Sequence, residues 1–409
     1  MPKPQTPPPA RQGPRPLPLH LLSASLTWLT SCAALPIAKS GSLNWNPALR
    51  DLAERLTAEL AAAPAEPLSQ ALGAEAVHRL TAMMEGIRRY RDHPYRRPPN
   101  RPSVVWREGA TELLDYGGEG APVQFVPSLV NRGYVLDLSA RHSLLRYLRG
   151  QGLRPWLVEW GDPGAAERGF TFTDYIAGRL ERIVQRAVAE AGKPVAMVGY
   201  CMGGNLALAA ALRQPQHVAR LALLATPWNF HAEQAGQAQL LGTMRPMVGA
   251  SLAGVDAMPI DALQSFFLAL DPMLAARKFA AFAALDPASE AAEDFVALED
   301  WLNDGVPLVA RVAEECLTGW YGENSPMLGR WRVAGAAVDP AALTCPALIV
   351  LPSSDRIVPP LSAQALAEAI PHARWLNPQA GHIGMVVGTR AESALWQPLS
   401  AWLGAPPMQ

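Results

Sequence analysis

The chain has 409 residues, and its 35 basic and 36 acidic side chains leave a formal net charge of −1. Without an excess of basic residues there is little to release counterions from a nucleic-acid backbone, so a DNA-binding or RNA-binding protein is not expected. Four cysteines are too few for a disulfide scaffold and lack the paired spacing of a zinc site. The length is sufficient for two or three domains with a large apolar core.

The N-terminal region opens with proline-rich sequence. Residues 1–18 hold prolines and basic residues with almost no apolar content, which predicts a disordered tail. The apolar run in residues 20–38 has two interpretations. Together with the preceding basic residues it resembles a secretion signal, and Leu29–Cys32 resembles a lipoprotein cleavage site. We favour an amphipathic or buried helix, because the run contains several hydroxyl side chains and is too short to span a bilayer.

Residues 47–92 predict two helices separated by Pro64 and Pro67. Apolar side chains recur at three-to-four spacing in both, which is typical of one buried helix face: Leu49, Leu52, Leu56 and Leu60, then Val77, Leu80, Met84 and Ile87. The proline cluster in residues 93–102 can continue neither helix nor sheet, so it marks a domain boundary. We therefore expect an N-terminal helical extension over residues 19–100.

From Ser103 onward, strands alternate with helices. Strands are predicted at residues 104–109, 111–118, 121–130, 153–161, 194–198, 219–227, 345–352 and 373–380, and helices at 141–152, 171–192, 205–212 and 362–370. This alternation predicts a mostly parallel sheet with helices on both faces, formed by residues 101–228 and 339–409. Residues 229–338 interrupt it with helical sequence, so we expect an inserted helical cap.

A cysteine lies in a nucleophile-elbow motif. Residues 199–204 read GYCMGG and stand between a predicted strand and a predicted helix, which is the context that the G-x-[S/C]-x-G motif requires. Glycine permits the tight turn, and the helix N-terminus behind Cys201 would stabilise a thiolate. The backbone N–H of Met202 would then point at a developing oxyanion. A purely structural turn is the alternative interpretation.

Two further residues complete a triad in the order nucleophile, acid, histidine. Asp355 follows a predicted strand at the edge where open α/β sheets place their active sites, although it could instead cap the next helix. His382 follows the last predicted strand. The combination predicts an α/β-hydrolase fold with a Cys201–His382–Asp355 triad. The other histidines considered, which are His78, His93, His142, His217 and His372, lack a comparable context.

The choice of cysteine as nucleophile indicates the type of reaction. A thiolate is a strong nucleophile, and the thioester that it forms keeps an acyl group activated for transfer. An acyltransferase benefits from this more than a simple esterase does. No metal or cofactor is expected.

Several segments are together similar to the polyhydroxyalkanoate synthases, an α/β-hydrolase family. They are PSLVNRGYVLDL (127–138), the following SLLRYLRGQGLRPWLVEWGDP, GYCMGGNLAL, LLATPWNF, SSDRIVPP and GHIGMVVG, in the order found in that family. The resemblance covers residues 100–405, and the length and cap are most similar to the catalytic subunit of the class III enzymes.

This resemblance implies a role for each matched residue. Cys201 would take a 3-hydroxyacyl group from coenzyme A, so acyl-CoA is a substrate and not a cofactor. His382 would deprotonate the thiol and then the incoming hydroxyl, and Asp355 would orient His382 or assist the hydroxyl. Val130 and Met202 would supply the oxyanion N–H groups. A homodimer or a non-catalytic partner subunit, a cytoplasmic location and contact with polymer granules through the N-terminal segment would also be expected.

The sequence departs from the family at two positions and leaves two other functions open. Asn205 and Asn229 stand where the synthases usually carry threonine and aspartate. The elbow also resembles that of dienelactone hydrolases, so a thioesterase or esterase that uses the same triad without polymerisation is the main alternative. A non-catalytic granule-binding subunit is the third, and an intact triad argues against it.

Overall fold

The computed structural model describes residues 10–405, apart from 46, 99–100, 233–248 and 251. By its internal contacts the chain divides into two compact units. One unit, which we call the helical unit, comprises the residues up to Tyr95 together with Gln264–Asn303. The other comprises Arg96–Leu263 together with Asp304 onward, and we call it the catalytic unit because it contains the predicted triad. Part of the cap predicted over residues 229–338, Gln264–Asn303, thus groups with the N-terminal extension.

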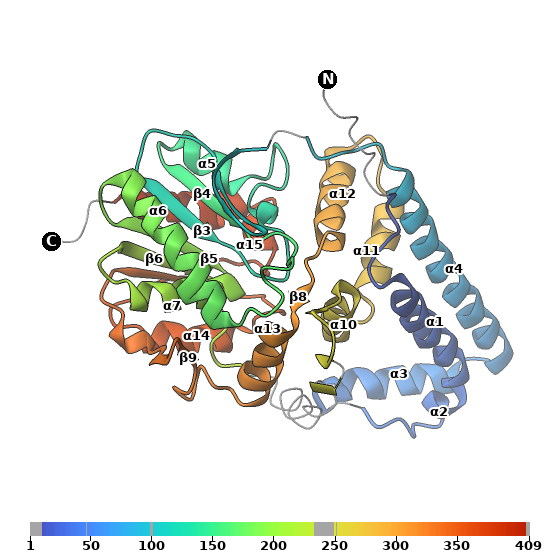
Figure 1. The fold of residues 1–409 in the computed structure, drawn as a ribbon. Coiled ribbons are helices and arrows are strands. Elements are labelled where there is room, and N and C mark those ends of the chain that lie inside the picture. The colour runs from blue at the N-terminus through green and yellow to red at the C-terminus, as the bar shows by residue number, and fades with distance from the viewer. Residues whose placement is uncertain (1–9, 46, 99–100, 233–248, 251, 406–409) are drawn as a thin grey trace. The chain divides into compact units, whose positions relative to one another are not determined.

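The catalytic unit is built on an eight-stranded sheet in the order β1-β2-β4-β3-β5-β6-β11-β12 (Figure 1). Its strands are β1 (Ser103–Glu108), β2 (Thr111–Asp115), β3 (Pro122–Val126), β4 (Arg154–Glu159), β5 (Val195–Tyr200), β6 (Val218–Leu224), β11 (Ala347–Val350) and β12 (Arg374–Leu376). Strand β2 pairs antiparallel with β1 and β4, and every other pair is parallel. The strands β3, β5, β6 and β11 are almost wholly buried, as strands covered on both faces must be.

Helices cover this sheet and follow its strands along the chain. They are α5 (Leu144–Gly150), η3 (Asp174–Leu180), α6 (Glu181–Ala191), α7 (Met202–Arg213), α14 (Pro360–Ala369), α15 (Gly384–Val387), η6 (Glu392–Trp396) and α16 (Gln397–Gly404). Figure 1 shows α6 and α7 in front of the strands and the red C-terminal helical segments behind them. The predicted sheet covered by helices is confirmed.

The catalytic unit also keeps part of the predicted insertion. It contains β7 (Ala257–Met258), β8 (Leu308–Val309), α13 (Ala310–Glu314) and η4 (Glu315–Gly322), followed by β9 (Arg332–Val333), β10 (Ala336–Ala337) and η5 (Pro340–Ala342). Strands β7 and β8 pair antiparallel, with Ala257 opposite Val309 and Met258 opposite Leu308. Helix α10 (Ile260–Leu270) begins two residues after β7.

The helical unit packs helices from two separate parts of the chain. They are α1 (Leu17–Ala33), α2 (Leu35–Lys39), η1 (Pro47–Leu49), α3 (Arg50–Ala62), α4 (Ala65–Asp92), α11 (Leu274–Ala283) and α12 (Glu290–Asn303). Helix α4 comes so close to α11 that a Cβ at Gly86 would lie 1.9 Å from the backbone oxygen of Phe279. Met83, Ile87 and Phe279 belong to one buried apolar cluster. This packing explains why Gln264–Asn303 groups with the N-terminal residues.

Arg11 fixes the segment that precedes α1. Its guanidinium donates to both carboxylate oxygens of Asp300 at 2.6 and 2.7 Å, and to the backbone oxygens of His93 and Tyr95, both at 2.6 Å. The side chain is only 8% exposed. The prediction of a disordered tail over residues 1–18 is therefore wrong for residues 10–18, because each of the three guanidinium nitrogens of the buried Arg11 donates to a specific acceptor and α1 begins at Leu17. Residues 1–9 lie outside the described part of the chain.

Several predicted apolar faces of this unit are exposed. On α1, the side chains of Leu19, Leu22, Leu26 and Leu29 are 41–61% exposed and share one face, and only Ala24 of this helix is buried. The predicted inward face of α3 is also exposed, since Leu49, Leu52 and Leu56 are 37–55% exposed. On α4, Met83 and Ile87 are buried, whereas Val77 and Met84 are exposed. None of the helices in the described residues is both long and apolar enough to cross a membrane.

Candidate active site

Cys201 occupies the turn between β5 and α7. Its backbone has φ 56° and ψ −131°, a region that non-glycine residues rarely adopt and that is found at functional sites. The turn is held at its base, where the backbone N–H of Cys201 donates to the carbonyl of Leu224 at 2.9 Å. The nucleophile is therefore presented on a strained and well-anchored turn.

The glycines of the elbow are required by close backbone contacts. A Cβ at Gly199 would lie 2.4 Å from the Cα of Gly204, and one at Gly203 would lie 2.1 Å from the backbone oxygen of Val126. A Cβ at Gly204 would lie 1.8 Å from Oγ1 of Thr226. The motif is thus imposed by the packing of α7 against the strands on either side.

Asp355 and His382 lie together after strands β11 and β12. Nδ1 of His382 is 2.6 Å from Oδ2 of Asp355, and both side chains are at least 93% buried. A carboxylate only accepts hydrogen bonds, so Nδ1 carries the proton of this bond. The other oxygen, Oδ1, accepts the backbone N–H groups of Ile357 and Val358. Asp355 therefore combines the two roles that the sequence left as alternatives, because it both holds the histidine and orders the following turn.

The thiol of Cys201 is in hydrogen-bonding contact with the side chain of His382. Burial alone would lower the pKa of His382, but the negative charges of Cys201 and Asp355 and the hydrogen bonds to both of them raise it to about 10. A histidine with this pKa is protonated at neutral pH, which is the form expected beside a thiolate. The structure thus brings the half-buried Cys201 together with the buried His382 and Asp355 in one chain of contacts.

The two residues expected to form an oxyanion hole differ in the acceptors that the structure offers to their backbone N–H groups. Met202 is the first residue of α7, where a backbone N–H has no acceptor within the helix. The N–H of Val130, in contrast, donates to Oγ of Ser128 at 3.3 Å. Val130 follows β3, which neighbours β5 in the sheet. The loop after β3 must therefore exchange this internal bond for a substrate oxygen if Val130 is to act as a donor.

Aromatic side chains from the retained part of the insertion pack near the nucleophile. The ring of Phe230 lies 4.9 Å from that of Tyr321 and 5.4 Å from that of Trp320. On the same element η4, the buried Cys316 has its pKa raised to about 12, first by burial and then by the charge of Cys201. A second thiol therefore lies in the surroundings of Cys201 but is held in its protonated form.

The departure at Asn229 preserves a hydrogen-bond framework. Its Oδ1 accepts from Nδ2 of Asn324 at 2.9 Å and from the backbone N–H of His231 at 3.1 Å. An aspartate would accept the same two bonds. Asn205 is fully buried and donates through Nδ2 to the carbonyl of Pro227 at 2.7 Å. Both asparagines thus hold the loop after β6 in place.

Sequence reasoning missed two contacts of the triad and its loop. The ring of Tyr200 stacks on His382 with centroids 5.1 Å apart, and its hydroxyl donates to the His382 carbonyl at 3.2 Å. The position of Tyr200, directly before the nucleophile, was the signal that could have indicated it. Ser128 was the other residue missed, and its place in the PSLVN segment was the available signal.

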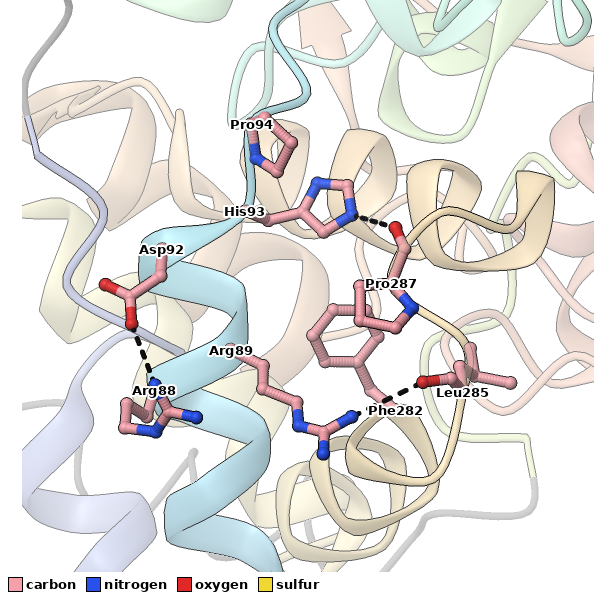
Figure 2. A pocket seen from close by; sticks show the side chains of 8 residues that line it. All are labelled: Arg88, Arg89, Asp92, His93, Pro94, Phe282, Leu285 and Pro287. Atoms are coloured by element: carbon pink, nitrogen blue, oxygen red, sulfur yellow. Dashed lines mark hydrogen bonds and ion pairs between the residues drawn. The ribbon is translucent and has the colours of Figure 1, made fainter.

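A separate hollow of about 170 Å³ lies in the helical unit, between the end of α4 and the chain that follows α11 (Figure 2). Figure 2 shows that the polar side chains lining it already interact with one another or with nearby backbone oxygens. Arg88 donates to Asp92 at 3.2 Å, Arg89 to the Leu285 carbonyl at 3.4 Å, and Nε2 of His93 lies 2.9 Å from the Pro287 carbonyl. The hollow contains no nucleophile, so the candidate chemistry belongs to the catalytic unit.

Comparison with known proteins agrees with this geometry. A family model described as the alpha/beta hydrolase fold matches residues 136–389. The poly(3-hydroxyalkanoate) polymerase subunit PhaC of a Synechocystis species is 30% identical over 298 residues, which cover 69% of this chain and 77% of that protein. The chain belongs to the PhaC family. Two more PhaC relatives are similar, from Allochromatium vinosum (29% identity, 72% of this chain and 82% of the relative) and Haloferax mediterranei (26%, 80% and 68%).

Membership of the PhaC family confirms the resemblance inferred from the sequence motifs, and the alpha/beta hydrolase match confirms the predicted fold class. The matched residues include the whole Cys201–His382–Asp355 chain of contacts.

Proposed function

We propose that this protein polymerises 3-hydroxyacyl groups from coenzyme A into polyhydroxyalkanoate through a thioester on Cys201. The proposal is supported by the similarity to PhaC polymerase subunits and by one observation above all, the contact of Cys201 with a histidine that is itself bonded to a buried carboxylate. The enzyme is accordingly an acyltransferase of the synthase type.

In the first half-reaction the thiolate of Cys201 attacks the thioester carbonyl of 3-hydroxyacyl-CoA. The backbone N–H groups of Met202 and Val130 stabilise the oxyanion that forms. The carbon–sulfur bond to coenzyme A then breaks, and protonated His382 gives its proton to the departing thiolate. The products are free CoA and an acyl group in thioester linkage to Cys201.

Acylation prepares His382 for the second half-reaction. The charge of Cys201 is the largest of the effects that raise the pKa of His382, and acylation removes that charge and the associated hydrogen bond. The pKa of His382 therefore falls when the thioester forms, and the neutral imidazole can accept the proton of an incoming hydroxyl group. Asp355 keeps the ring oriented throughout. The hydroxyl oxygen then attacks the thioester, which forms an ester and regenerates the thiolate.

The exposed face of α1 supports a place for the N-terminal segment at the polymer surface. Leu19, Leu22, Leu26 and Leu29 present an apolar stripe on a helix without a single acidic or basic side chain other than His20. An uncharged ester polymer matches such a surface. Association with a second copy of the chain or with a non-catalytic subunit is part of the same proposal.

The fate of the acyl group tests the proposed function. The purified protein is incubated with 3-hydroxybutyryl-CoA, and free CoA and product size are followed together. We expect CoA release accompanied by polymer, with neither produced by the Cys201→Ala variant. CoA release with only monomeric acid would show a thioesterase, and CoA release by Cys201→Ala would exclude the triad.

A further inference from the structure

The segment that follows α12 runs beside the loop that contains Val130. The backbone N–H of Val306 donates to the carbonyl of Val130 at 3.2 Å. The next residue of the loop, Asn131, forms an isolated antiparallel bridge with Gly305. Two consecutive residues of the loop are therefore held by Gly305 and Val306, which are remote from it in sequence.

Arg132 strengthens this attachment with its side chain. Its guanidinium donates to both oxygens of Asp162 at 2.8 and 2.9 Å, and Nε lies 3.6 Å from Oδ1 of Asp304. Nη1 lies 3.7 Å from Glu159, whose own carboxylate accepts the backbone N–H of Gly133 at 3.2 Å. The guanidinium is 19% exposed. One arginine thus connects the Val130 loop to the end of β4 and to the segment after α12.

The charges around Arg132 make this connection sensitive to the loss of any one member. Burial raises the pKa of Glu159 and of Asp304, while the guanidinium opposes both shifts. Three carboxylates from two other segments therefore share one cation, and Asp304 also accepts a hydrogen bond from Tyr134. A fork-shaped guanidinium can reach several of them at once, which an ammonium group cannot do.

We propose that Arg132 and Asp304 are positioning residues that hold the Val130 backbone N–H where the acyl oxyanion develops. This inference rests on the proposed function, because it takes Val130 as an oxyanion donor. Val130 now donates to Ser128, so the loop must present the same N–H within about 3 Å of a substrate oxygen. A misplacement of about 1 Å can reduce a rate by about 100-fold, so the anchor of this loop sets the rate of acylation.

Two reactions of the same thiol separate positioning from folding. Acylation of Cys201 by 4-nitrophenyl butyrate, followed as a burst of 4-nitrophenolate, passes through an oxyanion. Alkylation by iodoacetamide is a displacement at a saturated carbon and needs only the thiolate. For Asp304→Asn and Arg132→Lys we expect the maximal acylation rate to fall about 10-fold. The ester concentration that gives half of this rate should stay within about twofold of that of the unchanged protein, and so should the rate of alkylation.

The matched control is Glu181→Gln. Glu181 accepts from Arg213 at 2.5 Å, and Arg213 is the last residue of α7, at the opposite end from Cys201. This variant removes a comparable half-buried ion pair and should change neither rate.

Two results would overturn the inference: acylation that is unchanged in both variants, or acylation and alkylation that fall together with the thermal midpoint. Failure of the proposed function would look different. In that case the unchanged protein would still react with the ester and respond to Asp304→Asn, yet would make no polymer from 3-hydroxybutyryl-CoA.

Discussion

Nδ1 of His382 and Oδ2 of Asp355 lie 2.6 Å apart, while Oδ1 of the same carboxylate is occupied by the backbone N–H groups of Ile357 and Val358. The two oxygens of one side chain thus serve two different partners. This division allows a direct test of the role of Asp355, because an asparagine at this position keeps one oxygen and carries an NH₂ group in place of the other.

The Asp355→Asn variant should fold and lose activity. Its remaining oxygen can accept from Ile357 and Val358, but its NH₂ group would then face Nδ1 and force the histidine proton onto Nε2. That tautomer cannot accept a proton from a thiol or a hydroxyl, so we expect CoA release to fall on the order of 10³-fold or more, with the thermal midpoint nearly unchanged. Activity within about tenfold of the unchanged protein would show that Asp355 is not needed to orient His382.

Iodoacetamide should distinguish Cys201 from the other thiols of the catalytic unit. Burial raises the pKa of Cys316 to about 12 and that of Cys345 to about 11, so both remain protonated at pH 7. Cys201 lies at the start of helix α7 and contacts the protonated His382. We expect Cys201 to react at least about 10-fold faster than Cys316 or Cys345, measured by peptide mass spectrometry, with no such fast site in Cys201→Ser. Equal labelling of all three would contradict a selectively reactive Cys201.

Removing the thiol should lower the pKa of His382. In Cys201→Ala the imidazole loses its largest favourable charge interaction and a hydrogen bond, while burial still opposes its protonation. We expect an NMR titration of the His382 ring to show a pKa near 10 in the unchanged protein and a clearly lower one in the variant. Cys345→Ala is the matched control and should leave the titration as it was.

The raised pKa of His382 also has a consequence for stability. A group whose pKa is higher in the folded protein than the ordinary value of 6.5 stabilises the fold fully below that pH. This contribution is lost as the pH rises toward 10. The difference in unfolding free energy between the unchanged protein and His382→Gln, measured in urea, should therefore shrink across that interval. A difference that grows with pH would contradict the assigned charge state.

The elbow should not tolerate alanine at Gly203. A Cβ there would lie 2.1 Å from the backbone oxygen of Val126, which cannot move without displacing β3. We expect Gly203→Ala to lower the free energy of unfolding by at least about 3 kcal/mol or to prevent soluble expression. Gly150 ends α5 with open space around it, so Gly150→Ala should be neutral or stabilise by about 0.5 kcal/mol. Similar effects of both changes would refute the packing argument.

The leucines of α1 should be needed for binding to polymer but not for chemistry. Glutamine at Leu22, Leu26 and Leu29 preserves helix propensity and removes the apolar stripe. We expect binding to poly-3-hydroxybutyrate particles in a sedimentation assay to weaken at least about 10-fold, with CoA release in solution unchanged. Glutamine at Leu328 and Leu361, which are similarly exposed in the catalytic unit, is the control. Equal binding by both variants would exclude this face.

The sequence predicts the catalytic unit better than the helical unit, and the reason is physical. In the eight-stranded sheet, strands such as β3, β5, β6 and β11 coincide with local apolar runs, and the elbow around Cys201 is a local motif, whereas the two-residue strands β7 to β10 lie in sequence that predicted only helices. The side of α4 that is buried depends instead on where α11 packs. That contact is set by Gly86 and Phe279, which are separated by almost two hundred residues, and periodicity alone cannot reveal it.

The attachments of the Val130 loop were hidden for a similar reason. Val306 donates a hydrogen bond to Val130 through its backbone, and a backbone hydrogen bond does not depend on the type of residue that makes it. Arg11 looked like one more basic residue of a proline-rich tail, yet it is buried against Asp300. In both cases the partner is distant in sequence, so composition gives no indication of the contact.

The two-part construction of the helical unit determines how this chain can be shortened. Deleting everything before Arg96 would not remove a domain, since it would strip α1 and α4 from α11 and α12 and leave Phe279 and Val296 bare. Such a shortened chain should aggregate. To remove the whole helical unit, Gln264–Asn303 must be deleted as well, and Leu263 must be joined to Asp304. These two residues lie close along the chain to β7 and β8, and the antiparallel pairing of these strands already brings the two cut ends near each other.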